Sequence, residues 1–210
     1  MATSPEIFPT QSASQPAWDV ALLFPIQGDW SENDYLALDT KRLVELVDGS
    51  LEVLPVPTII HQLIVKFLFL ALQGYVEPRK IGTVLFAPTP IKIRPKSMRE
   101  PDVIYVAANG MRQASGKYLT RADLVIEVVS DDSKSQQRDY QDKRKDYAEL
   151  SVSEYWIVDP QSEAITVLVL DGSEYRTQGE YSGGQQAASQ LLSGFAVDVS
   201  AVFAAGRAVP

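Results

Sequence analysis

Residues 124–129 constrain the fold more than any other stretch of the chain. They read LVIEVV, so a strand there would carry apolar side chains on both faces, with Glu127 as its one charged residue. Side chains alternate between the two faces of a strand. A strand that is apolar on both faces is typical of the centre of a sheet that other elements cover on both sides. The run therefore predicts a central sheet flanked by helices.

The rest of the sequence supplies further strands and two contrasting helices. Asp48-Gly49 joins two short apolar runs within residues 42–55, which is a strong hairpin signal. Residues 59–77 are apolar on most sides and predict a helix packed on the sheet, whereas residues 135–150 predict a strongly polar helix. Ser31 is typical of the N-cap of a short helix. Further strands are predicted at residues 83–87, 91–94, 101–106, 154–159, 164–170 and 173–181. The expected fold class is α/β with a central mixed β-sheet.

Composition limits the chemistry that the chain can perform. It has 210 residues, no cysteine and one histidine, His61. Disulfides, thiolate metal sites, cysteine nucleophiles and multi-histidine zinc sites are therefore excluded. Any metal must be held mainly by carboxylate oxygens, which favours magnesium, manganese or calcium. The net charge of −8 is a poor background for non-specific nucleic-acid binding, although a basic groove can lie on an acidic body.

The chain is expected to hold one folded domain. Residues 1–28 are rich in proline, serine and glutamine and predict a flexible leader, followed by a single domain over residues 29–205. The leader does not have the pattern of a secretory signal, and no uninterrupted apolar run reaches ~18 residues, so we expect no membrane span. The absence of cysteine fits a cytoplasmic location.

Glu127 needs a partner if its strand is buried. A lone buried carboxylate costs several kcal/mol or becomes protonated unless a cation or hydrogen-bond donors compensate for it. Asp102 begins another strand, where carboxylates of neighbouring strands can converge as magnesium ligands. Lys143 is a second candidate partner, and also a candidate electrostatic catalyst. It lies in the middle of the one stripe of the polar helix with apolar content, formed by Tyr140, Lys143, Tyr147 and Leu150. This stripe is therefore expected to face the protein interior.

Each of these residues also has a purely structural interpretation. Glu127 and Lys143 would then form a buried ion pair, or the lysine stem would lie on the sheet with its amine in water. Asp102 would be a turn residue after proline. Glu45 would stand at a strand edge beside basic neighbours, and His61 would pack or cap the apolar helix.

The order of the motifs resembles a known nuclease superfamily. Pro101-Asp102 followed by Glu127 in a later apolar strand is similar to the PD-(D/E)XK pattern, whose usual lysine position is Val129 here. Some branches carry the lysine on the following helix instead. The chain resembles one of them, the bacterial Uma-two family of restriction endonucleases, over residues 31–203. The matching motifs are VELVDG at 44–49, PD at 101–102, EVVS at 127–130, Asp139-x3-Lys143-x3-Tyr147, and EYWIVD at 154–159.

This resemblance implies a restriction-endonuclease-like core and Mg²⁺-dependent hydrolysis of DNA phosphodiesters, with Mn²⁺ as a substitute. It implies that Asp102, Glu127 and the backbone carbonyl of Val128 hold the metal, with Glu45 as a further candidate ligand. Lys143 would orient or deprotonate the water, or stabilise the transition state. The motif residues Asp139 and Tyr147 would support Lys143. Apart from the resemblance, His61 at the start of the apolar helix is a further supporting candidate. Homodimerisation is expected, because relatives pair and two strand cuts favour two active sites.

Two points stay open at this stage. The basic residues Lys92, Arg94 and Arg144 would contact DNA phosphates, or else belong to a solvated charged face. The protein would alternatively be a non-catalytic binding or assembly module that keeps the nuclease fold, which the acidic net charge and Val129 favour. A nuclease acting on RNA or on branched DNA is a further alternative.

Overall fold

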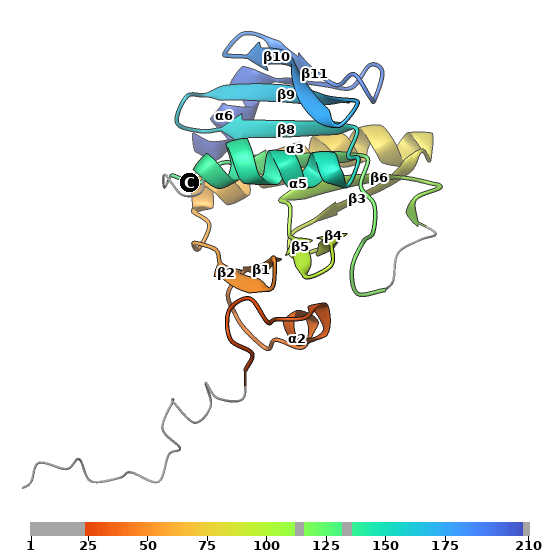
Figure 1. Cartoon of the computed structure of the whole chain (residues 1–210). Helices are drawn as coiled ribbons and strands as arrows, with labels where there is room; N and C mark the ends of the chain where they lie inside the picture. Colours follow the sequence, from red (N-terminus) through yellow and green to blue (C-terminus); the bar gives the residue numbers. More distant parts are fainter. Residues whose placement is uncertain (1–23, 112–115, 132–135, 208–210) are drawn as a thin grey trace, which may run out of the picture.

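The computed structural model describes residues 24–111, 116–131 and 136–207, so most of the expected leader lies outside the described residues. A six-stranded mixed sheet forms the centre of this part of the chain (Figure 1), as the sequence predicts. β7 and β8 are parallel, and the other neighbours are antiparallel. In spatial order the strands are β10 (Glu174–Tyr181), β9 (Ala164–Asp171), β8 (Glu154–Asp159), β7 (Leu124–Val128), β6 (Val103–Ala107) and β3 (Gly82–Phe86).

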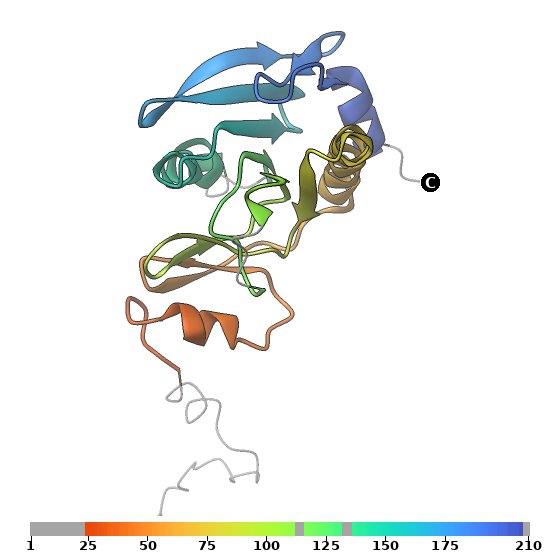
Figure 2. The ribbon, with the colours of Figure 1, turned by 90° about the vertical axis from the view of Figure 1, so that its right-hand side faces the viewer.

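β7 is buried along its whole length, which is the reason for its unusual sequence. Leu124, Ile126 and Val128 pack in one core with α3 (Ile59–Arg79) and α6 (Val199–Arg207). Val125 and Val129 pack in a second core with Tyr147 of α5 (Lys143–Glu149). Figure 2 shows α5 on one side of the sheet and α3 with α6 on the other. Because faces alternate along a strand, Glu127 belongs to the α5 side.

α3 begins where Thr58 caps it, since the Thr58 hydroxyl accepts a hydrogen bond from the backbone N–H of His61 at 3.1 Å. It buries one side against the central sheet through His61, Ile64, Val65, Leu68, Leu72 and Val76. Among the described helices, α3 alone is long and apolar enough to cross a membrane. Core helices of soluble proteins also meet that criterion, which rests on length and composition alone. α3 is buried along one side only, because 33% of its apolar window is buried, and Ile59, Ile60 and Leu70 are exposed.

A smaller sheet lies beside the central one, with strand order β2-β1-β5-β4. Its strands are β1 (Val44–Val47), β2 (Ser50–Val53), β5 (Ser97–Arg99) and β4 (Ile91–Arg94). Asp48 and Gly49 both have positive φ, 47° and 78°, as the predicted two-residue hairpin requires. α2 (Glu32–Leu36) packs below this sheet and starts with the predicted Ser31 cap. The sequence did not predict β5.

The polar helix differs from its prediction at its start. Residue 135 lies outside the described part, and Arg138–Asp142 forms a π-helical segment, η2, that leads into α5. Its hydrogen bonds span five residues instead of four, so the backbone turns less per residue and the helical stripe shifts. Tyr140 is 37% exposed as a result, and the prediction that it faces inward with Lys143 and Tyr147 is wrong. The final elements, β11 (Gln186–Ala188), β12 (Ala196–Asp198) and α6, were not predicted.

Candidate active site

The predicted site residues meet at the carboxyl end of β7. A cavity of about 40 Å³ lies there, between the start of α3, the start of η2 and the loop before β6. This volume is enough for a water molecule or an ion. We call it the acidic cavity, because its polar lining includes Glu100, Asp102, Glu127 and Asp139, together with His61, Arg138 and Lys143. The structure therefore brings Asp102, Glu127 and Lys143 together.

Glu127 is 3% exposed, and two donors reach its Oε1 atom. The Tyr147 hydroxyl donates a hydrogen bond at 2.5 Å, and Lys143 Nζ lies at 2.8 Å. Burial raises the pKa of Glu127 to about 8; Lys143 opposes the rise, and the charges of Asp102 and Asp139 add to it. The charged form of Glu127 is therefore only partly compensated, and additional positive charge beside it would be favourable.

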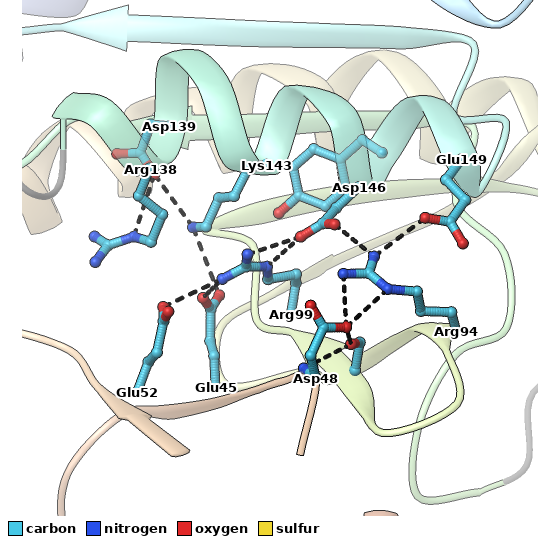
Figure 3. A network of polar contacts seen from close by, with 12 residues as sticks. Glu45, Asp48, Glu52, Arg94, Arg99, Arg138, Asp139, Lys143, Asp146 and Glu149 are labelled. Carbon is cyan, nitrogen blue, oxygen red and sulfur yellow. Dashed lines mark hydrogen bonds and ion pairs between the residues drawn. The ribbon is translucent and has the colours of Figure 1, made fainter. Parts of the chain in front are cut away.

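Lys143 is a cation shared by three of the acids. Its Nζ lies 2.8 Å from Glu127. Figure 3 shows its contacts with Asp139, at 3.4 Å, and with Glu45, at 3.6 Å. The side chain is 3% exposed, so the alternative in which its amine reaches water is wrong. Burial alone would lower the pKa of Lys143, but the three carboxylates outweigh it and raise the pKa well above its ordinary value. Lys143 is accordingly a stable cation.

Asp102 is fixed beside Glu127 through the backbone. Its Oδ2 accepts a hydrogen bond from the N–H of Val128 at 2.8 Å, and lies 3.3 Å from Nε2 of His61. Burial lowers the pKa of His61, but the contact with Asp102 outweighs burial and raises it. His61 thus holds Asp102 from the first turn of α3. Its Nδ1 is buried and has no hydrogen-bond partner among the described residues.

Glu45, the further candidate metal ligand, is completely buried and already paired. Its Oε2 lies 2.8 Å from Nη1 of Arg99, and its Oε1 accepts the backbone N–H of Glu100 at 2.9 Å. Burial alone would raise the pKa of Glu45, but Lys143 and Arg99 outweigh it and lower the pKa to about 2. Glu45 is therefore not the strand-edge residue of the structural interpretation. It connects the small sheet to Lys143 and to the loop that carries Asp102.

Arg99 and Asp146 are the site-supporting residues that the sequence did not reveal. Arg99 is 3% exposed, and its Nη2 lies 2.7 Å from Asp146 of α5 (Figure 3). Arg94 reaches the other oxygen of Asp146 at 2.6 Å. Two features of the sequence are the available signals for these residues, although neither predicts the contact between them. Arg99 directly precedes Glu100-Pro101-Asp102, and Asp146 stands three residues after Lys143, on a neighbouring part of the helix surface.

The three basic residues considered for DNA contact all have partners within the protein. Lys92 Nζ lies 2.6 Å from Glu32, Arg94 pairs with Asp146, and Arg144 donates to the carbonyl of Tyr175 at 2.5 Å. None of the three lines the acidic cavity.

The donor chemistry of the acidic cavity fits a hard divalent cation. Asp102, Glu127 and Asp139 present carboxylates to it, and Mg²⁺ and Mn²⁺ prefer oxygen ligands. Oδ1 of Asp139 is buried without a hydrogen-bond partner in residues 24–111, 116–131 and 136–207. In those same residues, no group of three or more histidine or acidic side chains is placed so that it could hold a metal ion. Lys143 and Arg138 supply positive charge there.

Comparisons with known proteins show the family and the fold of the chain. A family model named Uma2 and described as "Putative restriction endonuclease" matches residues 32–200. The chain is also similar to a solved structure, "a putative nuclease belonging to DUF820 from Anabaena variabilis ATCC 29413". The two share 16% sequence identity with a TM-score of 0.67, over 87% of this chain and 99% of the other, so the likeness shows the fold. No curated protein matches the chain. The family match covers most of the sequence, and the chain belongs to the Uma2 family.

Proposed function

We propose that this protein is a Mg²⁺-dependent DNA endonuclease, in which Mn²⁺ can replace Mg²⁺. The observation that carries the proposal is the contact between a buried carboxylate and a buried lysine, Glu127 and Lys143, at 2.8 Å in a cavity that also contains Asp102. Membership of a family described as restriction endonucleases and the nuclease fold support the same reaction class.

The roles of the residues follow from their contacts. Asp102, Glu127 and the carbonyl of Val128 would hold the metal, which when bound supplies positive charge to the phosphate and lowers the pKa of a water molecule. Lys143 would stabilise negative charge on the phosphate, or orient the water by a hydrogen bond, because its raised pKa keeps its proton in place. Tyr147 holds Glu127 and His61 holds Asp102, so both carboxylates are positioned before substrate arrives.

A plasmid-cleavage assay tests the proposal. Supercoiled DNA is incubated with wild type, Glu127→Gln, Lys143→Met and the control Glu52→Gln, each with Mg²⁺, with Mn²⁺ and with a chelator. Glu52 is a suitable control because its side chain is 44% exposed and does not line the acidic cavity. We expect wild type and the control to cleave only with metal, and the other two variants to lose at least ~100-fold in rate. Cleavage that persists in Glu127→Gln would refute the site.

One observation favours a second candidate, the non-catalytic binding or assembly module. Lys143 already lies against Glu127 at 2.8 Å, and the described residues contain no group of three histidine or acidic side chains that could hold a metal ion. Calorimetric titration with Mg²⁺ and Mn²⁺ separates the two candidates, because a nuclease of this kind must bind at least one of them at millimolar concentration. RNA and branched DNA are tested in the same cleavage assay.

The assembly and location of the protein remain predictions. We propose a homodimer, for which sedimentation at micromolar concentration is the test, and a cytoplasmic location.

A further inference from the structure

A second, larger cavity adjoins the acidic cavity. It measures about 410 Å³, and Pro55, His61 and Ser130 line both. It lies past the carboxyl ends of β7 and β8, where Val129, Asp131 and Pro160 contribute to its lining. Ligands of α/β proteins commonly bind beyond the carboxyl ends of parallel strands, and the volume falls within the ~300–1,000 Å³ typical of small-molecule pockets. We call it the apolar cavity.

Most of its surface is apolar, although half of its lining residues are polar or charged. Ile64 and Phe203 are buried lining residues, whereas Val56 and Ile60 are 77% and 48% exposed. Thr58, His61, Ser130 and Gln161 add a few polar groups. A concave apolar surface with a small number of polar groups is the usual composition of a ligand pocket. Exposed apolar side chains beside it increase the surface that an apolar group would cover.

The charges around the apolar cavity argue against a phosphate group as its occupant. Its lining contains two acids, Asp131 and Glu163, and one cation, Arg207. Arg207 already pairs with Glu163. Gln161 donates to the backbone carbonyl of Asp131 at 3.1 Å, so its amide is also engaged. A flat, weakly polar group suits this lining better than an anion does.

We infer that the apolar cavity binds the base of an unpaired nucleotide next to the phosphate that is cut. This inference rests on the proposed function: if the scissile phosphate lies at the acidic cavity, the base is the part of the adjoining nucleotide that matches an apolar pocket. His61, which lines both cavities, would stand between the reacting phosphate and the bound base. A base inside a duplex is stacked and paired, so it must leave the helix to enter, and this is least unfavourable where it is already unpaired. The preferred substrate is therefore DNA with a bulged or otherwise unpaired nucleotide.

Binding of three fluorescent duplexes tests the inference without catalysis, with Ca²⁺ in place of Mg²⁺. The first is fully paired, the second carries one bulged adenine nucleotide, and the third carries the same bulge as an abasic site. We expect the bulged duplex to bind roughly tenfold tighter than either of the others, because only it offers an unpaired base.

Two adjacent positions on α3 offer a matched pair of variants. Ile59 and Ile60 are both exposed in the first turn, and Ile60 lines the apolar cavity whereas Ile59 does not. Ile60→Glu and Ile59→Glu add the same charge to the same helix end. Ile60→Glu should remove the preference for the bulged base, whereas Ile59→Glu should keep it. Circular dichroism verifies that both variants fold.

The results separate this inference from the proposed function. Equal affinity for the bulged and abasic duplexes overturns the inference, as does an equal effect of both variants, even if plasmid DNA is still cut. A preference for the bulged base that Ile60→Glu abolishes supports base binding in the apolar cavity. If no DNA is cut as well, the proposed function fails while base binding stands. Failure to bind any of the three duplexes overturns both proposals.

Discussion

Replacing Glu45 by glutamine should show whether this residue stabilises the fold through its charge. The side chain is completely buried between Arg99, Lys143 and the backbone N–H of Glu100. Glutamine has nearly the same shape but no charge. The substitution therefore leaves the buried guanidinium of Arg99 without one of its carboxylates and places an amide beside two cations.

The expected loss of stability follows from the pKa of Glu45. It falls from 4.5 to about 2 in the folded protein, and each pH unit of such a difference corresponds to about 1.4 kcal/mol. The charged carboxylate thus contributes about 3 kcal/mol to the free energy of unfolding. Because the folded pKa is the lower one, this contribution is present above pH 4.5 and is lost as the pH falls towards 2.

Urea unfolding followed by circular dichroism measures this difference. We expect Glu45→Gln to be less stable than wild type by about 3 kcal/mol near about pH 7, and by only about 2 kcal/mol near about pH 3.5. Glu52→Gln is the matched control, since Glu52 faces Glu45 across the β1–β2 pair and lies 3.4 Å from Arg99 with its side chain 44% exposed. Such an exposed pair contributes less than ~1 kcal/mol.

Two results would refute this reasoning. One is a difference below ~1 kcal/mol between the unfolding free energies of wild type and Glu45→Gln at neutral pH. It would mean that the cost of desolvating the buried ion pairs cancels the attraction within them. The other is a difference in unfolding free energy that is the same at neutral and at acidic pH. It would mean that Glu45→Gln loses stability through altered packing and not through the lost charge. If Glu45→Gln is stable but no longer binds Mn²⁺, Glu45 is a metal ligand after all.

Three further outcomes are expected for the acidic cavity, with stability measured in chelator and cleavage measured with Mg²⁺. Burial raises the pKa of Glu127 from 4.5 to about 8. Its contribution to the free energy of unfolding is therefore full below pH 4.5 and is lost as the pH rises towards 8. Over this pH range, the melting temperature of wild type should fall more steeply than that of Glu127→Gln. Asp139→Asn should raise the melting temperature in chelator, because burial raises the pKa of Asp139 and makes its charged form unfavourable. A clear decrease would show that the attraction between Asp139 and Lys143 exceeds the cost of burying the charge. Tyr147→Phe removes the hydrogen bond to Glu127 and should cost about 1–3 kcal/mol in urea unfolding, with slower cleavage; unchanged values for both would deny it a positioning role.

Periodicity in the sequence was sufficient to predict the central sheet. The apolar character of β7 on both faces, the Asp48-Gly49 turn and the long apolar run of α3 are local patterns, and each produced the expected element. The proximity of Glu127 and Lys143 was also predictable, since an inward lysine and a buried glutamate satisfy each other's charge.

The network around Arg99 was not predictable in the same way. Arg99 meets Glu45 of β1 and Asp146 of α5 because the small sheet packs beside the central one, and this packing leaves no period in the sequence. The exposure of Tyr140 escaped prediction for a related reason, since a five-residue π-helical segment breaks the regular spacing on which the inward stripe was based. The short strands β5, β11 and β12 have three residues each, too few for a periodic signal.

Four segments that are distant in the sequence meet at Lys143 and the acids around it: β1, the loop before β6, β7 and the start of the polar helix. Contacts between such distant segments form slowly, because the chain loses loop entropy before it gains them. The acids also repel one another until Lys143 arrives. We therefore expect the two apolar cores to consolidate before the acids come together during folding, so that the acidic cavity is completed last.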